Sequence, residues 1–151
     1  MRVEEFRRAL DKRSASRGLE VVFHPPASTE ALQALSERLG GPLPFQVELF
    51  LRAHDGLVVR EPALSVLPCA QWVPVGGFVH FATFDGQHRL GFDTRSRNDA
   101  DQWDLVHVDT GDRVTLTMAS FWSNKVFAWV DKRRPIWESQ GGMPPCGAGC
   151  R

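Results

Sequence analysis

The sequence predicts a single α+β domain in which N-terminal helices and a C-terminal helix pack on one face of a curved antiparallel β-sheet. Two observations predict this class. Up to residue 56, apolar residues recur at helical spacing, whereas from Leu57 onward apolar and polar residues alternate with the period of two that is typical of strands. A helical pattern returns after Ser120. With 151 residues, of which 42% are hydrophobic and 24% charged, the chain has the size and composition of one folded domain.

Three helices are expected before the sheet. Each shows apolar residues three or four positions apart and is followed by glycine, which favours the left-handed backbone that ends a helix. The expected helices are residues 3–17, stopped by Gly18; a helix capped by Ser28 and stopped by Gly40 and Gly41; and a helix starting at Pro44 and running to Asp55 and Gly56. Between the first two, residues 19–23 form an apolar run that predicts a strand or an extended arm.

Four strand-like segments follow, with turn sequences between them. In the first, Phe78, His80, Ala82 and Phe84 are expected on one face of the sheet and the residues between them on the other. The other three alternate in the same way and are centred on Leu90 and Phe92, on Val106 and Val108, and on Val114, Leu116 and Met118. This pattern predicts an antiparallel meander.

A last helix completes the expected domain. Ser120 precedes its apolar stripe, and the helix is expected to end before Pro135 and to pack on the sheet. The domain is therefore expected to span residues 1–137. Residues 138–151 carry four glycines and two prolines with little to bury, so we expect a flexible tail there.

The overall charge gives no sign of a polyanionic partner. With 18 basic and 18 acidic residues, the chain has no net field that favours nucleic acid or an anionic membrane. The N-terminus is charged where a signal peptide needs an apolar run, and no stretch of 18 apolar residues occurs. Three cysteines are an odd count, which disfavours a disulfide framework. We expect a cytoplasmic protein that contacts neither nucleic acid nor membrane directly.

Three stretches carry a resemblance to a known family. Residues 27–56 contain a Leu-rich helix, a Leu-Pro hinge and a helix ending in Asp-Gly; residues 79–94 contain an apolar-Phe strand, a glycine turn and a strand closing on Phe92 and Asp93; residues 120–130 begin with Ser-Phe. In this order they resemble the SUKH superfamily, which includes regulators of yeast cell-wall synthesis and many bacterial immunity proteins. The resemblance implies an α+β fold and no catalytic residues.

Two classes of function remain open at this stage. The resemblance implies, for a bacterial chain, a frequent role as the antidote of a polymorphic toxin that is often a nuclease, and hence a basic protein toxin as partner. The alternative is a regulatory scaffold or a small-ligand-binding module of the same fold. A deep apolar pocket would favour this alternative.

No enzyme motif anchors a catalytic function. The sequence contains no Gly-x-Gly-x-x-Gly, Walker loop, Gly-x-Ser-x-Gly elbow or His-Glu-x-x-His. His54 and Asp55 are adjacent and could form a general base, but a histidine in the last turn followed by Asp-Gly is typical of a helix end. Cys69 has no basic residue beside it in the sequence that would lower its pKa, so we expect it to fill space in the core. The sequence therefore predicts a protein that is not an enzyme.

Two pairs of residues have spacings that a metal could use. His107 and Asp109 are two positions apart on an expected strand, so both would leave the same face, although solvent-facing polar residues give the same pattern. Cys146 and Cys150 could chelate a metal or form a disulfide, but a zinc site needs four ligands and no second pair accompanies them. We therefore expect no metal and no cofactor.

The region from Asp85 to Asp112 is acidic within a neutral chain. It holds seven aspartates and three arginines, a formal charge of −4. Most of these aspartates belong to expected turns, where the residue is common, so solvated turns are one interpretation. The other is a binding edge for a basic protein, centred on Trp103, and this interpretation requires the indole to be exposed among the acids and not in the core. The candidate partner-binding residues are Asp93, Asp99, Asp101, Trp103, Asp104, Asp109 and Asp112.

Overall fold

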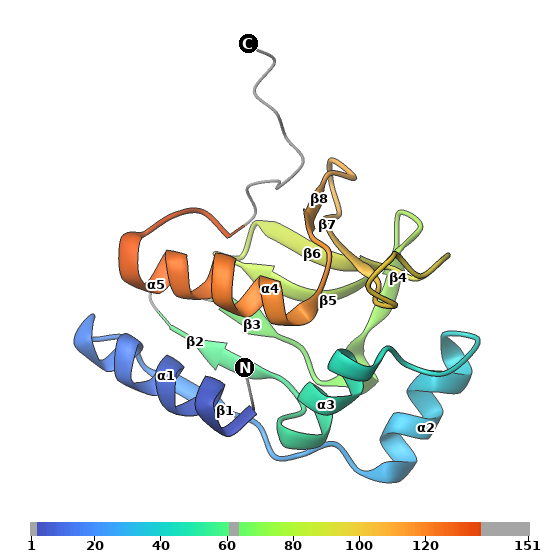
Figure 1. Cartoon of the computed structure of the whole chain (residues 1–151), viewed down its shortest axis with the longest axis horizontal. Helices are drawn as coiled ribbons and strands as arrows, with labels where there is room; N and C mark the ends of the chain where they lie inside the picture. The colour runs from blue at the N-terminus through green and yellow to red at the C-terminus, as the bar shows by residue number, and fades with distance from the viewer. Residues whose placement is uncertain (1–2, 61–63, 137–151) are drawn as a thin grey trace, which may run out of the picture.

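The structure, a computed structural model, describes residues 3–60 and 64–136 (Figure 1). Within them, helices are combined with an open, curved antiparallel sheet of eight strands, which confirms the predicted α+β class. The expected tail, with Cys146 and Cys150, lies outside the described residues. Among the helices that are described, none has both the length and the apolar character needed to cross a membrane.

The chain order explains how the sheet and the helices alternate. Here η1 is a short 3-10 helix and η2 is a π-helical stretch inside the C-terminal helix. The elements are α1 (Val3–Ser16), β1 (Val21–Phe23), α2 (Thr29–Arg38), α3 (Phe45–Ala53), β2 (Leu57–Val59), β3 (Leu64–Val66), η1 (Cys69–Gln71), β4 (Val73–Val75), β5 (Phe78–Phe84), β6 (His88–Asp93), β7 (Asp104–His107), β8 (Arg113–Thr115), α4 (Met118–Ser120), η2 (Phe121–Val126) and α5 (Phe127–Lys132).

The helix termini follow from local sequence. The Ser28 hydroxyl accepts a hydrogen bond from the Ala31 amide at 3.0 Å, which satisfies one of the free donors in the first turn of α2. After α1, Gly18 takes a left-handed φ of 70° and turns the chain toward β1. Pro44 is the N-cap of α3, one position before the helix begins. These three helices therefore lie where the sequence predicts them.

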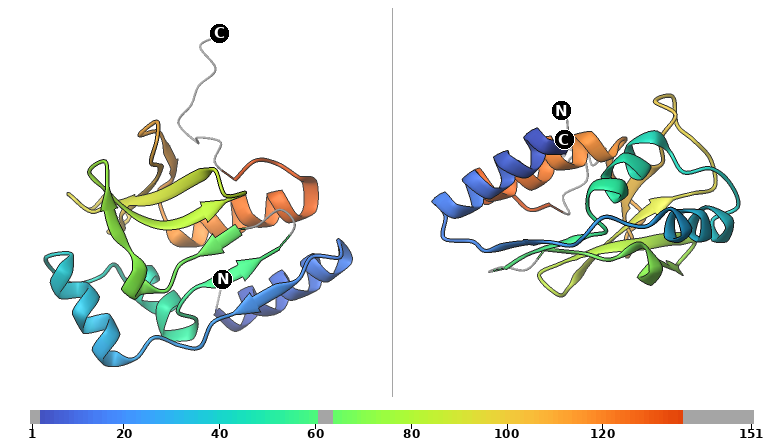
Figure 2. Two further views of the ribbon diagram at one scale, coloured as in Figure 1. Left: turned by 180° about the vertical axis from the view of Figure 1, so that it is seen from behind. Right: turned by 90° about the horizontal axis from the view of Figure 1, so that it is seen from below.

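The sheet is a meander with one side branch. Its strands follow the order β1-β2-β3-β5-β6-β7-β8, and β4 pairs with the first half of β5. Figure 2 shows α1 and α5 on one side of the sheet, with α3 on the same side. The aromatic rings of Trp72, Phe81, Phe92 and Phe121 meet beneath these helices, and all four side chains are fully buried. The predicted packing of helices on one face is confirmed.

Strand β5 does not keep the predicted alternation along its whole length. The register of its pairing with β6 shifts between His80 and Ala82, which marks a β-bulge. Before the bulge Val79 points into the core, and after it Ala82 and Phe84 do, while His80 and Thr83 are only partly buried. The predicted single face of Phe78, His80, Ala82 and Phe84 is therefore wrong, because one extra residue reverses the faces midway.

The C-terminal helix begins earlier than predicted. Thr117, not Ser120, is its N-cap, since the Thr117 hydroxyl accepts a hydrogen bond from the Ser120 amide at 3.0 Å. The expected strand residue Met118 accordingly lies in the first turn of the helix, where it is 2% exposed. The helix ends at Lys132, before Pro135 as predicted, and Arg133 follows in the left-handed conformation with a φ of 59°.

Candidate partner-binding surface

Each arginine of the acidic region pairs with one aspartate. Arg95 binds Asp93 through two hydrogen bonds of 2.9 and 2.8 Å, and these bonds lower the pKa of Asp93. Arg89 forms an ion pair with Asp109, whose pKa is lowered for the same reason. Arg97 pairs with Asp101 at 3.1 Å. The charge of −4 is therefore carried by the four remaining carboxylates: Asp85, Asp99, Asp104 and Asp112.

The connection between β6 and β7 is a fixed loop with Asn98 at its centre. The Asn98 side-chain oxygen accepts hydrogen bonds from the amides of Ala100 and Gln102, at 2.9 and 3.2 Å. Its side-chain nitrogen donates to Asp104 Oδ1 and to the Leu116 carbonyl, both at 2.8 Å. We call residues 97–104 the acidic loop. These four hydrogen bonds of one side chain hold the loop together, while residues 99–101 remain exposed to solvent.

Trp103 is not the exposed aromatic residue that a binding edge centred on it requires. It is 5% exposed and packs on Phe92, with ring centroids 5.6 Å apart. The acids around it lie on the rim of the sheet while the indole itself belongs to the core. The expectation of an exposed indole ringed by carboxylates is therefore wrong, and Trp103 is removed from the candidate binding residues.

Exposed apolar side chains lie beside the acidic loop instead. Phe45 and Leu49, one helical turn apart on α3, are 71% and 40% exposed, and Leu116 is 38% exposed. Arg97 donates to the Pro42 carbonyl at 2.6 Å, which ties the acidic loop to the start of α3. We call Phe45, Leu49 and Leu116 the apolar patch. The sequence pattern of α3 does not reveal the patch, because α3 is apolar on two faces and only Val47, Phe50 and Leu51 form its buried stripe.

A small apolar groove opens next to the patch. It has a volume of about 60 Å³, and its lining residues are Phe6, Gln46, Leu49, Phe50, Met118, Ala119 and Trp122. The Gln46 side-chain oxygen accepts a hydrogen bond from the Ala119 amide at 2.9 Å, which fixes α3 against the start of the C-terminal helix. The Trp122 indole N–H is buried and has no acceptor in the part of the chain that the structure describes.

His54 and Asp55 serve the helix end. The His54 amide donates to the Phe50 carbonyl at 2.8 Å, and its ring packs on Phe23 with centroids 4.7 Å apart. The Asp55 carboxylate accepts a hydrogen bond from the Cys69 amide at 2.7 Å. Each side chain is therefore engaged in holding α3 to the strands and to η1.

Cys69 lies in the core, as predicted, but a basic residue does approach it. The Arg38 guanidinium donates to the Cys69 carbonyl at 2.8 Å. Burial and the neighbouring Asp55 carboxylate nevertheless raise the pKa of the Cys69 thiol to about 11. The thiol is 1% exposed and stays protonated at neutral pH.

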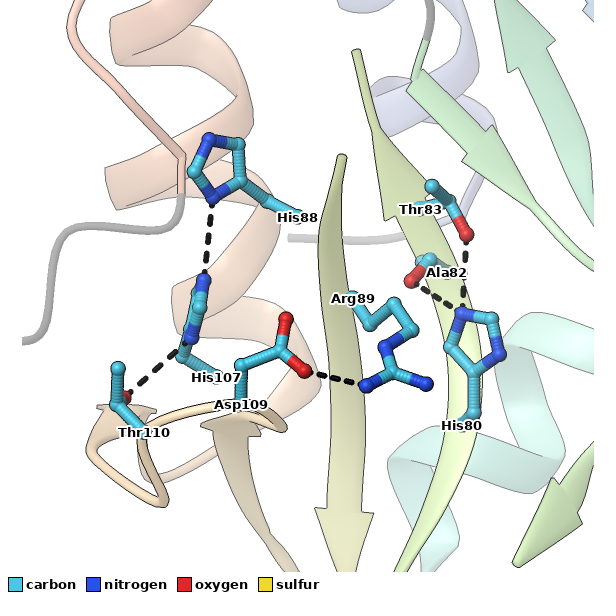
Figure 3. A network of polar contacts seen from close by, with 8 residues as sticks. All are labelled: His80, Ala82, Thr83, His88, Arg89, His107, Asp109 and Thr110. Atoms are coloured by element: carbon cyan, nitrogen blue, oxygen red, sulfur yellow. Dashed lines mark hydrogen bonds and ion pairs between the residues drawn. The ribbon is translucent and has the colours of Figure 1, made fainter. Parts of the chain in front are cut away.

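His107 and Asp109 do not share a face, because β7 ends at His107 and Asp109 belongs to the following turn. Figure 3 shows the outcome: His107 Nε2 lies 3.2 Å from His88 Nδ1, whereas Asp109 turns toward Arg89. The expected geometry for a shared metal is therefore wrong. Residues 3–60 and 64–136 contain no group of three or more His, Cys, Asp or Glu side chains placed to hold a metal ion.

Three histidines make the fold sensitive to acid. Burial is the largest cause that lowers the pKa values of His54, His80 and His107, and the nearby charge of His88 adds to the effect at His107. A histidine with a lowered pKa binds its proton more readily in the unfolded chain. The free energy of unfolding is therefore constant above the ordinary histidine pKa of about 6.5 and decreases as the pH falls below it.

Thermal unfolding at pH 7.5 and at pH 5.5 measures this effect. We expect a lower Tm at pH 5.5, and a smaller difference between the two pH values for His54→Gln than for the parent. Each histidine contributes at most about 1.4 kcal/mol per pH unit. A Tm that rises on acidification would contradict the assignment.

Comparisons with known proteins identify no family for this chain. No protein-family model matches the sequence, and no curated protein is significantly similar to it. The resemblance seen in residues 27–130 therefore stays a hypothesis, and the residues themselves carry the functional argument.

Proposed function

We propose that this chain is a non-catalytic binding protein that neutralises a basic protein toxin, in the manner of a bacterial immunity protein acting in the cytoplasm. The observation that carries the proposal is the acidic loop. A loop fixed before binding loses little conformational entropy when a partner docks, and its carboxylates are already in place. The family resemblance of the sequence supports the same class.

The separation of charge within the molecule also supports a basic partner. Residues 3–17, which comprise α1 and the residue after it, carry five basic and three acidic residues, and α1 lies against α5 on the side of the fold away from β8 (Figure 1). Asp99 and Asp112 lie at the opposite edge, beyond β6 and β7. We call the edge of the sheet that carries Asp99 and Asp112 the acidic edge; it keeps a local negative field in a neutral protein, and such a field speeds the approach of a basic partner.

The small-ligand alternative receives less support. Pockets for small molecules usually enclose about 300–1,000 Å³. The apolar groove beside α3 has about 60 Å³, enough for one small aliphatic side chain. Two other hollows, one between α2 and α3 and one beside α1, have about 480 Å³ each, but both are open and lined in part by charged side chains, so neither is a deep apolar pocket. The size of the apolar groove suits an anchor residue of a protein partner better than a free metabolite.

Asp99→Asn combined with Asp112→Asn tests the proposal. The partner to use is the product of a toxin gene adjacent to the gene of this protein. We expect the double variant to lower the association rate several-fold at about 0.01 M salt and much less at about 0.1 M, because the screening length falls from about 30 Å to about 10 Å. The dissociation rate should change little.

Asp11→Asn is the matched control, since it removes an exposed aspartate from α1, away from the acidic edge. It should leave the association rate unchanged. If the toxin keeps its activity at a one-to-one ratio with the parent protein, the chain is not its antidote. If the double variant associates like the parent at both salt concentrations, the acidic edge is not the interface.

A further inference from the structure

We propose that the apolar patch and the groove beside it form the docking site of the partner, and that the site receives an aliphatic side chain flanked by Lys or Arg. This inference rests on the proposed function for the basic character of the partner. It assigns the binding energy to α3 and the start of the C-terminal helix, which carry none of the candidate partner-binding residues predicted from the sequence.

Exposure singles out this part of the molecule. Five large hydrophobic residues are exposed in the described chain, and three of them form the apolar patch. The other two, Val22 and Val73, lie on β1 and β4. Phe45, at 71%, is the most exposed of the five. An exposed aromatic residue beside a groove is typical of the anchor points that dominate binding energy.

The patch is continuous with the acidic loop. The Arg97 side chain donates a hydrogen bond to the Pro42 carbonyl, and the Asn98 side chain donates one to the Leu116 carbonyl. Gln46 then links α3 to the start of the C-terminal helix. These contacts connect the apolar patch to the acidic loop, which carries Asp99 and Asp104. An apolar centre with a charged rim is the usual composition of a protein-binding site.

This surface specifies the chemistry of its occupant. The groove is lined mainly by apolar side chains, so it favours an apolar anchor, and its volume of about 60 Å³ suits a small aliphatic one. The carboxylates of the acidic loop, which hydrogen bonds to the Pro42 and Leu116 carbonyls hold beside the apolar patch, favour Lys or Arg near that anchor. The occupant is therefore a basic protein segment with one aliphatic anchor, and an acidic or uncharged segment does not match.

Trp122 gives an independent indication that the site takes a ligand. Its side chain lines the groove and is 5% exposed, yet its indole N–H lacks an acceptor among the described residues. A buried donor without an acceptor is unfavourable by about 1–3 kcal/mol. Because this nitrogen is itself buried, a docked segment relieves the cost only when the groove opens enough for a backbone carbonyl to reach the indole.

A phage-displayed library of random linear peptides provides an unbiased probe. The library is selected on the parent protein and screened against the double variant Phe45→Ser with Leu49→Ser, both at exposed positions where serine should leave the fold intact. We expect enriched peptides with an aliphatic residue next to Lys or Arg, and about 30-fold or greater loss of affinity for the double variant. The double variant Val22→Ser with Val73→Ser is the matched control and should bind like the parent.

Nuclear magnetic resonance then locates the bound peptide. The indole N–H signal of Trp122, assigned by its loss in Trp122→Phe, should move on peptide binding, which a contact confined to the acidic loop would not cause. The inference is overturned if no enriched peptide distinguishes the parent from the Phe45 and Leu49 variant, or if peptides that need these residues have no excess of Lys or Arg. Peptides that depend on Asp99 and Asp112 alone would overturn the docking site and leave the basic-partner function standing.

Discussion

Gly56→Ala is expected to destabilise the fold by at least about 3 kcal/mol. Gly56 has a φ of +96°, which residues with a side chain rarely adopt, and an added Cβ would lie 2.3 Å from the Val66 carbonyl oxygen. The left-handed conformation alone is unfavourable by about 1–2 kcal/mol, and overpacking adds about 1–3 kcal/mol. Because the opposing atom belongs to the backbone of β3, it moves only if the sheet shifts. Thermal unfolding should show a Tm lower by about 6 °C or more.

Gly40→Ala separates the two causes. Gly40 also has a left-handed backbone, with a φ of +84°, but an added Cβ there meets no atom within 4 Å. We expect only the conformational part of the loss, about 1–2 kcal/mol. If both variants unfold at the same temperature, the close approach of Gly56 to β3 does not constrain the fold.

Trp103→Ala is expected to lower the free energy of unfolding by about 3–5 kcal/mol. The side chain is buried against Phe92, and removing a buried tryptophan leaves a cavity that the surrounding sheet fills only in part. The effect should appear as a lower midpoint in urea unfolding of the isolated protein, in the absence of any partner. A loss of partner affinity in this variant would then follow from unfolding.

Trp103→Phe and Asp99→Asn provide the comparison for that result. Phenylalanine keeps most of the buried area and should have a smaller effect on stability. Because Asp99 is an exposed residue of the acidic loop, Asp99→Asn should leave the free energy of unfolding unchanged within about 0.5 kcal/mol. If Trp103→Ala is as stable as the parent, the indole does not belong to the core, and Trp103 is again a candidate binding residue.

Features that depend on a few neighbouring residues were predicted well. The Ser28 side chain accepts a hydrogen bond from a backbone amide in the first turn of α2, and Gly18 takes a left-handed φ after α1. Both helix boundaries therefore depend only on neighbouring residues. The last helix shows the limit of this reasoning. Threonine and serine are both good N-caps, so the sequence allows either Thr117 or Ser120. The choice depends on where the preceding strand ends, which the sequence does not show.

Of the candidate site, the sequence predicted only the excess of acidic residues. The acidic composition of residues 85–112 is visible in the sequence, but the pairing of Arg89 with Asp109 depends on the register between strands. The His88–His107 contact likewise requires two strands to lie side by side. The alternation of apolar and polar residues fixes which face a side chain takes, but which residues of two strands lie opposite each other also depends on the turns between them and on bulges.

The sequence by itself determined the α+β class, the order of helices and strands, and the presence of a local excess of acid, because these follow from periodicity, turn residues and composition. The tertiary structure alone decided which side chains are exposed. Trp103 is covered because β6 presents Phe92 to it, whereas Phe45 stays open because α3 has two apolar faces and the sheet covers only one. Burial depends on what packs against a residue, and that is a property of the assembled fold.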